Sequence, residues 1–511
     1  MAENDKIQSF WLLYKFLSSG QQISRNRQLF MLSHVPAICH THIVNLKTMR
    51  NKKDSGLKFT RELGLFTCTM IVVGLVIGSG VFKKIIPMAQ TNIGEIPILI
   101  AWAVAGIITL FGALSVGGLA SFTEESGGTY EYFRLSFGKF FAFISGWSDF
   151  MIVGTGVNAA LAFFFAQTIN SFITLPNPFE YSGTKIVAIT TMIFLTAINC
   201  IGTRESGVFN NLITSAKILG ILIVISFGLT YSVPQTSILP EIIKNVQTPT
   251  GFSFLSGFFT AMLAALWAFD GWIYVTNITR EVENPKRNMP IALALGILIT
   301  ILIYLILNFI FMQIVPVEVL RTISENEIGA LVVANALLGS YGKTILSILI
   351  LVCVFGALNS NIVSIPRKYY QMAHEGYFFS KVKEIHPRFK TPVKALTYSM
   401  VWSSILVLSG SFDMLTDMVV FTAFVFYGSL CVALIKMKRN GLIKVKVAGY
   451  PYAPIIFLIF SSMFLVHTLY TEPNKSLFGF ILILSSIPFY FYFRHINKRA
   501  EKHTMTTNLP K

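Results

Sequence analysis

Apolar runs long enough to cross a lipid bilayer recur along the whole chain. A helix needs roughly 20 apolar residues to span about 30 Å of hydrocarbon, and the sequence predicts about twelve such spans. They begin near residues 64, 94, 140, 183, 209, 252, 289, 344, 394, 413, 451 and 476. Only 13% of the residues are charged, against about a quarter in an average soluble protein. The chain is therefore predicted to be an all-α integral membrane protein.

The positive charges indicate how the spans are oriented. The net charge is +17, and most Lys and Arg residues fall in tails and loops that share one side of the membrane. The positive-inside rule assigns that side to the cytoplasm. We therefore expect both termini in the cytoplasm, a location in the plasma membrane (the inner membrane of a bacterium), and no nucleic-acid partner. Residues 1–56 are expected to form a disordered cytoplasmic tail, 57–496 the transmembrane domain and 497–511 a second cytoplasmic tail.

The sequence lacks the signatures of several other membrane protein classes. It contains neither His-Glu-x-x-His nor Gly-x-Ser-x-Gly, so no enzymatic activity is expected. It also has no selectivity-filter motif, and "GKT" at Gly342–Thr344 lacks the first glycine of a phosphate-binding loop. The five cysteines show no metal-binding spacing and none lies in a predicted external loop. We therefore expect no metal, no cofactor and no structural disulfide.

The first span is interrupted near its middle. Its sequence "MIVVGLVIGSGVF", Met70–Phe82, is apolar but contains Gly74, Gly78, Ser79 and Gly80. A glycine inside a helix costs roughly 1 kcal/mol relative to alanine, so Gly-Ser-Gly in succession favours a break in the helix. Close packing against another helix is the second interpretation, because Gly74 and Gly78 form a GxxxG pair.

The sixth span has a matching interruption. In "TAMLAALWAFDGWIYVTNITR", Thr260–Arg280, Asp270 and Gly271 lie at the midpoint of an apolar run. A charge there costs roughly 2.5 to 3.5 kcal/mol on insertion scales and usually faces a polar interior, so Asp270 is a candidate site residue. Each interruption opens a block of five spans, and because five is odd the second block runs inverted. Paired interruptions in inverted repeats indicate a transporter site near the middle of the bilayer.

Breaking the two helices creates a binding site for a zwitterion. A break frees backbone N–H groups at the start of one half-helix and carbonyl groups at the end of the other. Such groups are tolerated in a membrane only around a ligand, water or protein partners. Free N–H groups favour a carboxylate, and free carbonyls favour an ammonium group. One site of this kind fits an α-amino acid.

Motifs along most of the chain resemble those of a known transporter family. The chain is similar to the amino acid, polyamine and organocation (APC) superfamily, and within it to the L-type amino acid transporter branch and its bacterial amino acid permease relatives. The resemblance extends from about Gly64 to Pro454. It rests on "IGSGVF" (Ile77–Phe82), "ESGGTYEYFRLSFGKFFAFISGW" (Glu125–Trp147), "LWAFDGW" (Leu266–Trp272), "EVENPKRNMPIAL" (Glu281–Leu293), "HEGYFFSKVKEIHPRFKTPVKAL" (His374–Leu396) and "GYPYAPIIF" (Gly449–Phe457). It implies a LeuT-like fold of two inverted five-helix repeats, with helices 1 and 6 discontinuous, plus two further helices.

The resemblance also implies roles for the residues at the two breaks. The backbone N–H groups at the first break would bind the substrate carboxylate, and these belong to Gly78, Ser79 and Gly80. Backbone carbonyls at both breaks would bind the substrate ammonium group, and these belong to Val76, Trp267, Ala268 and Asp270. Trp267 matches the aromatic residue that closes over the substrate as a gate, a role that its large flat side chain suits.

Lys217 lies in the middle of the fifth span, where a lysine needs carbonyls, a carboxylate or the loss of its proton. In the family that the chain resembles, a lysine at this place points at the unwound part of helix 1, where sodium-coupled relatives hold a sodium ion. A fixed cation would make bound sodium electrostatically unfavourable, which predicts sodium-independent transport. An ion pair that only joins helices is the second interpretation.

Other polar residues inside the spans leave alternatives open. Asp270 could pair with a cationic substrate or hold the broken segment, because relatives with "LWAYDGW" accept cationic as well as neutral amino acids. Asp149 is expected to join a helix network first and to be a proton or cation site second. Asn158, Asn359 and Asn361 are expected to hydrogen-bond between helices.

These features predict a secondary-active transporter that moves α-amino acids by alternating access. Exchange of one amino acid for another is the first expectation, and coupling to protons is the second. The alternatives are a proton-coupled transporter of amines or polyamines from the same superfamily, or a channel. The loop between spans 3 and 4, "SFITLPNPFEYSGT", has no cysteine like the one that joins animal relatives to a glycoprotein, so no such disulfide-linked subunit is expected.

Overall fold

The computed structural model describes residues 61–125, 127–176, 178–179, 182–201, 206–230, 249–389 and 391–507. The predicted N-terminal tail, 1–56, lies outside the described residues. Within the described part of the chain, 11 helices are long and apolar enough to cross a membrane. A shorter apolar helix of 17 residues, Val393–Ser409, lies where the ninth span is predicted. The prediction of an all-α protein with about 12 transmembrane helices is therefore confirmed.

The helices of the first predicted repeat follow one another along the chain. They are α4 (Leu65–Val76), α5 (Gly80–Lys83), α6 (Ile85–Gln90), α7 (Glu95–Ala120), α8 (Thr129–Phe137), α9 (Lys139–Ser148), the π-helical turn η2 (Asp149–Val153), α10 (Gly154–Asn170), α11 (Ser182–Ile201) and α12 (Ser206–Thr230). α4 and α5 form the first span, which α6 follows, and α9, η2 and α10 form the third.

The second predicted repeat and the last helices follow. They are α14 (Gly251–Ala268), the 3-10 helix η3 (Trp272–Glu281), α15 (Pro285–Ile314), α16 (Val317–Leu320), α17 (Gly329–Ser364), α18 (Pro366–His374), η4 (Ser380–Lys383), α19 (Val393–Ser409), α20 (Phe412–Arg439), α21 (Tyr452–Thr471), α22 (Pro473–Leu484) and α23 (Ser486–Thr507). α17 begins 15 residues before the predicted start of the eighth span near residue 344, and its backbone is non-helical at Leu338 and Gly339.

The first span breaks between α4 and α5. α4 ends at Val76, Ile77 has an extended backbone (ψ 95°), and helical structure resumes at Gly80. A Cβ atom on Gly80 would lie against the backbone of Ala268, so this position tolerates no side chain. The break therefore covers residues 77–79, and Gly80 begins the second half of the span.

The sixth span breaks between α14 and η3. α14 ends at Ala268, and Gly271 has a left-handed backbone (φ 99°), which disfavours any residue with a side chain. A Cβ atom there would also lie 2.7 Å from the carbonyl oxygen of Leu75 in α4. The two breaks are thus in direct contact, and glycine makes that contact possible.

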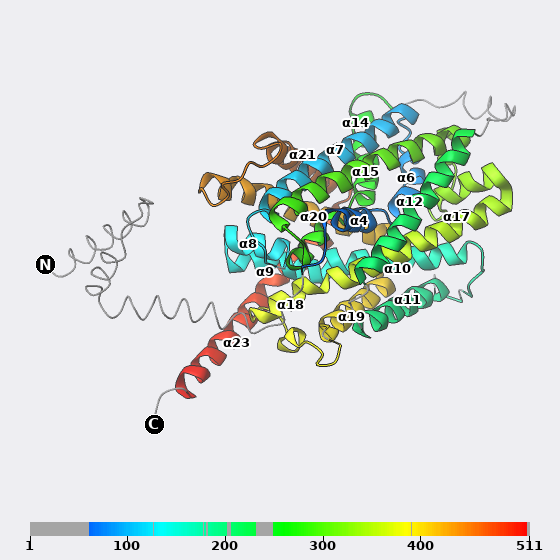
Figure 1. Ribbon diagram of the computed structural model, residues 1–511. Helices are drawn as coiled ribbons and strands as arrows, with labels where there is room; N and C mark the ends of the chain where they lie inside the picture. Colours follow the sequence, from blue (N-terminus) through cyan, green and yellow to red (C-terminus); the bar gives the residue numbers. More distant parts are fainter. Residues whose placement is uncertain are drawn as a thin grey trace. The chain divides into compact units, whose positions relative to one another are not determined.

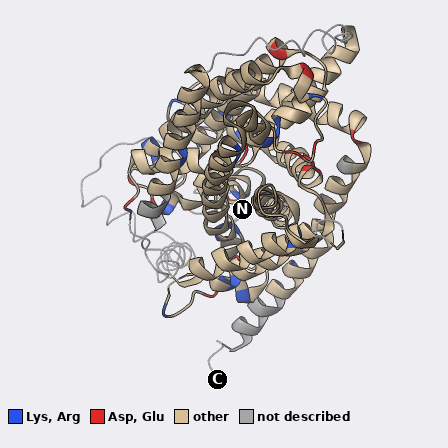
Figure 2. Cartoon of the chain, turned by 90° about the vertical axis from the view of Figure 1, so that its right-hand side faces the viewer, with Lys and Arg blue, Asp and Glu red and all other residues tan. Residues whose placement is uncertain are grey.

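The broken first span lies inside the helical bundle (Figure 1). α4 packs against α12, α15, α17 and η3. α10 is also interior and contacts α11, α17, α19 and α20. Most of the ribbon carries no charged side chain (Figure 2), and large apolar side chains are exposed on several helices, as at Phe194 in α11 and Val466 in α21. This arrangement suits a bundle whose outer surface faces lipid.

The loops on either side of the spans define two ends of the bundle. We call the end that carries α8 the α8 end, and the opposite end, which carries α16, the α16 end. Arg61, just before α4, pairs with Glu124, just after α7, at the α8 end. Arg321, just after α16, donates to Asn92 at the α16 end.

Candidate functional site

A pocket lies where the two broken helices meet. Its lining comes from both breaks and from two interior helices, and consists of Leu75, Val76, Gly78, Ser79, Gly80, Trp267, Asp270 and Gly271 with Val157 and Leu161 of α10 and Asn361 of α17. All the predicted site residues at the breaks except Ala268 line this pocket.

The first break presents hydrogen-bond donors to the pocket. Among the described residues, the backbone N–H groups of Gly78, Ser79 and Gly80 have no hydrogen-bond partner. Residues that follow them, such as Phe82, already donate to carbonyls of the same turn. A carboxylate can accept hydrogen bonds from such N–H groups. Because the carboxylate is charged, these bonds are stronger than bonds between neutral groups. The unwinding of residues 77–79 therefore leaves backbone donors at the pocket that suit an anion.

Carbonyl groups at the two breaks are bridged by Tyr304 of α15. Its hydroxyl group lies 3.2 Å from the carbonyl oxygen of Val76 and 3.0 Å from that of Ala268. A hydroxyl group has one hydrogen to donate, and each carbonyl oxygen has two lone pairs, so both carbonyls keep capacity for an ammonium group. Sequence reasoning missed Tyr304, although a tyrosine inside the apolar run "ILIYLIL" was a detectable signal.

The side chain of Asp270 is held by α20. Its Oδ1 atom accepts a hydrogen bond of 2.6 Å from the hydroxyl group of Tyr427. Its Oδ2 atom is buried and has no hydrogen-bond partner in the described part of the chain. The backbone N–H of Asp270 donates to the carbonyl oxygen of Trp267 at 3.1 Å. Asp270 therefore braces the second break and also lines the pocket.

Lys217 of α12 lies against the end of α4. Its side chain is buried, and Nζ donates to the carbonyl oxygen of Gly74 at 3.0 Å and to that of Ile77 at 3.3 Å. These carbonyls lie at the end of α4, where the chain unwinds. The positive charge of Lys217 thus occupies the negative end of the half-helix.

Trp267 lies between the pocket and the α16 end. Its indole Nε1 atom donates to Ser79 Oγ at 3.3 Å, which joins the two breaks. The indole ring also meets the ring of Phe412 edge to face, with centroids 5.9 Å apart. Trp267 is buried, so the pocket is covered on this side.

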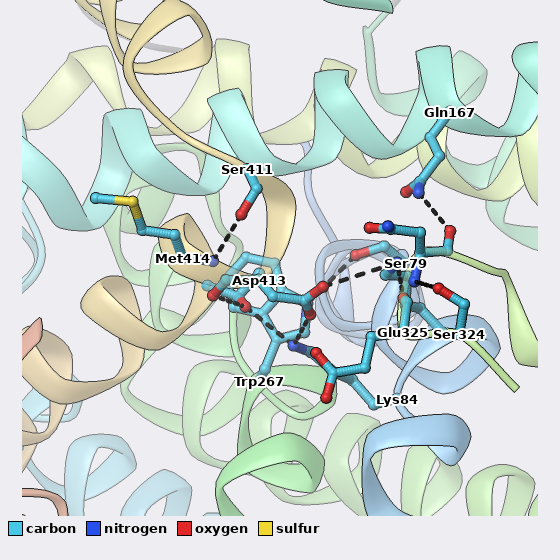
Figure 3. A network of polar contacts seen from close by, with 12 residues as sticks. Ser79, Lys84, Gln167, Trp267, Ser324, Glu325, Ser411, Asp413 and Met414 are labelled. Atoms are coloured by element: carbon cyan, nitrogen blue, oxygen red, sulfur yellow. Dashed lines mark hydrogen bonds and ion pairs between the residues drawn. The ribbon is translucent and has the colours of Figure 1, made fainter. Parts of the chain in front are cut away.

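Beyond Trp267, a charged network closes the α16 end (Figure 3). Lys84 Nζ lies 2.7 Å from Asp413 Oδ1 and 3.0 Å from the hydroxyl group of Thr416 in α20. Lys83 Nζ donates to the backbone carbonyl of Glu325 at 2.7 Å. The network connects the second half of the broken first span to α20 and to the loop before α17.

A second charged network lies at the α8 end. Lys368 Nζ of α18 is 2.7 Å from Asp149 Oδ1, and the hydroxyl group of Tyr369 is 3.1 Å from Asp149 Oδ2. Arg367 pairs with Glu281 at 3.1 Å. Asp149 begins the π-helical turn η2 and is not part of the pocket lining. It is thus a member of a helix network, as the sequence suggested first.

The intramembrane asparagines differ in their contacts. Asn359 of α17 accepts a hydrogen bond of 2.8 Å from Asn199 of α11, as expected for a bond between helices. Asn361 instead donates within its own helix, to the carbonyl oxygen of Ala357. The Oδ1 atoms of Asn158 and Asn361 have no partner among the described residues. The expectation of bonds between helices is therefore wrong for Asn361.

Comparisons with known proteins agree with this architecture. The amino acid permease family matches residues 63–493. The serine/threonine exchanger SteT of Bacillus subtilis is 30% identical over 446 residues, which cover 86% of this chain and 98% of SteT. The mouse b(0,+)-type amino acid transporter 1 is 27% identical (89% of this chain, 90% of the transporter), and the human cystine/glutamate transporter is 26% identical (88% and 89%). With its two broken helices and the pocket between them, the chain therefore belongs to the amino acid permease family of the APC superfamily, whose members are transporters rather than enzymes.

Proposed function

We propose that the protein exchanges α-amino acids across the plasma membrane by alternating access, without sodium. The observation that carries this proposal is the pocket between the two breaks, which offers free backbone N–H groups on one side and carbonyl groups on the other. An α-amino acid has the complementary pair of charges on adjacent groups.

The substrate would bind in one orientation. Its carboxylate would accept hydrogen bonds from the N–H groups of Gly78, Ser79 and Gly80. Its ammonium group would donate to carbonyls at the two breaks, those of Val76, Trp267, Ala268 and Asp270. The side chain would then extend toward α10 and α17, which supply Val157, Leu161 and Asn361 to the pocket.

Our proposal that transport needs no sodium rests on Lys217. Its ammonium group donates to two carbonyls at the end of α4, which are the kind of oxygen ligands that a sodium ion would need at an unwound helix. A second cation at this place would be repelled by the first.

Alternating access is supported by the two charged networks. The networks at the α16 end and the α8 end each join the broken helices to other parts of the bundle, and Trp267 covers the pocket between them. In our proposal the networks open in turn, so that the pocket faces one side of the membrane at a time. We assign the α8 end to the cytoplasm, with residues 1–56 and 497–511 as cytoplasmic tails and 57–496 as the transmembrane domain.

Coupling to protons is the second candidate mechanism. It is favoured by Asp270, which lines the pocket and whose Oδ2 atom is buried without a partner among the described residues. A buried carboxylate of this kind is a reasonable proton site. An amine or polyamine substrate would be carried by the same ammonium-binding carbonyls, although the free N–H groups of the first break would then have no function.

The relatives differ in the substrates that their names state. The names specify serine and threonine, cystine and glutamate, and large neutral amino acids. They therefore support amino acid exchange for this chain, but they do not specify which substrate side chain it prefers. We propose a stand-alone carrier with no disulfide-linked glycoprotein subunit, because the loop between spans 3 and 4 contains no cysteine.

Purified full-length protein in liposomes would test the proposal. Vesicles loaded with unlabelled amino acid should take up a labelled amino acid faster than empty vesicles do, and uptake should saturate. Replacing external sodium by choline should change neither result. Uptake that needs no internal amino acid but follows a proton gradient would favour the second mechanism, and uptake that fails to saturate would indicate a channel.

A further inference from the structure

Asn361 is a pocket residue whose side chain has an unused hydrogen-bond acceptor. It lies on α17, its side chain is fully buried, and it lines the pocket. Its Nδ2 atom donates to the carbonyl oxygen of Ala357 at 3.0 Å. Its Oδ1 atom has no hydrogen-bond partner within the described ranges. A buried polar atom without a partner is uncommon in folded proteins and calls for an explanation.

The orientation of the Asn361 amide follows from its chemistry. The oxygen and nitrogen of an asparagine amide are assigned from their hydrogen bonds. The carbonyl oxygen of Ala357 can only accept, so it must face the nitrogen of Asn361. The oxygen is therefore the free atom, and the nitrogen still makes only one of its two possible hydrogen bonds.

The surroundings of Asn361 explain why a side chain of the substrate would meet it. The groups that suit the α-carboxylate and the α-ammonium belong to the two breaks, whereas Asn361 comes from α17. The neighbouring contributions of α10, Val157 and Leu161, are apolar. Asn361 is thus the one polar side chain that a helix outside the breaks adds to the described lining of the pocket.

We infer that Asn361 is a specificity-determining residue that hydrogen-bonds a hydroxyl group on the side chain of the substrate. The carrier then prefers short hydroxyl amino acids over apolar amino acids of the same size. A hydroxyl group can donate to Oδ1 and accept from the second N–H of the amide, whereas an ammonium group can only donate and a carboxylate can only accept. Asn361 carries no charge that would favour an ionised side chain. This inference rests on the proposed function.

The physical basis of the preference is the cost of leaving a buried acceptor unpaired. A site built to hydrogen-bond a substrate hydroxyl group rejects an analogue that lacks this group far better than an apolar pocket rejects a wrong size. Threonine and valine have nearly the same shape, and serine differs from alanine by the hydroxyl group alone. Comparing these pairs therefore isolates the hydrogen bond from the volume of the side chain.

The first experiment uses wild-type protein in liposomes loaded with unlabelled threonine. Uptake of labelled threonine is measured against rising external threonine, valine, serine or alanine. Threonine should inhibit at a concentration at least about tenfold lower than valine, as a lost hydrogen bond to a buried group predicts, and serine at a lower concentration than alanine. Equal inhibition by threonine and valine would overturn the inference and would mean that resident water satisfies Asn361.

The second experiment compares variants. Asn361→Leu keeps a similar side-chain size and removes the acceptor, so the ratio of valine to threonine inhibition constants should fall toward one. Asn359→Leu is the matched control two residues away, because Asn359 bonds Asn199 and does not line the pocket. Its uptake rate is expected to fall while the ratio stays at the wild-type value. An unchanged ratio in Asn361→Leu would overturn the assignment.

The two proposals fail in distinguishable ways. If amino acids exchange but hydroxyl groups make no difference, only the role of Asn361 is wrong. If no amino acid accelerates uptake from the opposite side, the proposed exchange function is wrong and the role of Asn361 is rejected with it. Should Asn361→Leu not reach the membrane, the wild-type comparison of threonine with valine still decides the inference.

Discussion

The ammonium group of Lys217 donates a hydrogen bond of 3.0 Å to the carbonyl oxygen of Gly74. With its second bond, to Ile77 at 3.3 Å, it satisfies two of the carbonyls that the end of α4 would otherwise leave unpaired. The lysine comes from α12, so the broken first span is held by a helix that contributes nothing to the lining of the pocket. The shape of the first break therefore depends on a residue outside the pocket itself.

Removing this ammonium group should impair transport. Lys217→Met leaves the carbonyls of Gly74 and Ile77 without their donor, and charge-assisted hydrogen bonds contribute about 1.5 to 3 kcal/mol each. We expect the initial rate of amino acid uptake to fall at least about tenfold, since tenfold corresponds to about 1.4 kcal/mol. Lys185→Met is the control, because Lys185 is only half-buried and donates to the carbonyl oxygen of Leu408 rather than to the broken span. Strong stimulation of wild-type uptake by a sodium gradient would contradict our interpretation of Lys217.

A side chain at Gly80 should abolish binding without unfolding the rest of the bundle. Gly80→Leu must move Ala268 and so separate the two breaks, because even a Cβ atom meets the backbone of Ala268. We expect loss of amino acid uptake by variant protein that reaches the membrane. Gly64→Ala is a suitable control, since its nearest neighbour would be Glu283 at an ordinary 3.6 Å. Uptake by Gly80→Leu at the wild-type rate would show that the substrate does not bind between the two breaks.

Trp267 should govern affinity more than protein stability. Trp267→Ala removes the cover of the pocket and the hydrogen bond to Ser79, so KM should rise by roughly tenfold or more, in line with the large contribution of buried aromatic side chains. Trp267→Phe should have a smaller effect because the ring remains. Uptake measured over a range of amino acid concentrations gives KM. The role of gate would be wrong if Trp267→Ala kept both KM and the maximal rate.

The network at the α16 end should stabilise the closed form. Asp413→Asn leaves the buried Lys84 without a carboxylate partner, but the Asp413 side chain is 33% exposed, which reduces the cost. We expect the free energy of unfolding to fall by about 1 to 3 kcal/mol, the usual cost of an unsatisfied buried group. This loss would be measured as a lower Tm of the purified protein. Part of this stability should return in the double variant Lys84→Met with Asp413→Leu, which removes the unpaired Lys84 charge but still leaves Lys83, 3.7 Å from Asp413 Oδ2, without its carboxylate.

An exposed ion pair provides the reference for this measurement. Glu384→Gln breaks the pair with Lys394, which is exposed on both sides. Exposed pairs contribute about 0 to 1 kcal/mol, so Tm should hardly change. An equal loss of Tm in Glu384→Gln and Asp413→Asn would show that the network at the α16 end contributes no more than an ordinary surface pair.

Much of the fold follows from local signals. A run of apolar residues predicts a span because every backbone polar group in hydrocarbon must be paired within the segment. Glycines and the aspartate at the breaks are detectable because they are costly in an apolar helix. The start of α17 was predicted less well. The eighth span was predicted to begin near residue 344, whereas α17 begins at Gly329 and its backbone is non-helical at Leu338 and Gly339.

The sequence by itself determined the class of the protein and the positions of the two breaks, and it predicted an amino acid site between them. Only the tertiary structure decided which side chains complete the site, because the packing of one helix against another sets the direction in which each side chain points. Tyr304 bridges the carbonyls of Val76 and Ala268, which lie far apart in the sequence. Asn361 looked like a residue that joins helices, yet it lines the pocket, because α17 packs against α10 and α4.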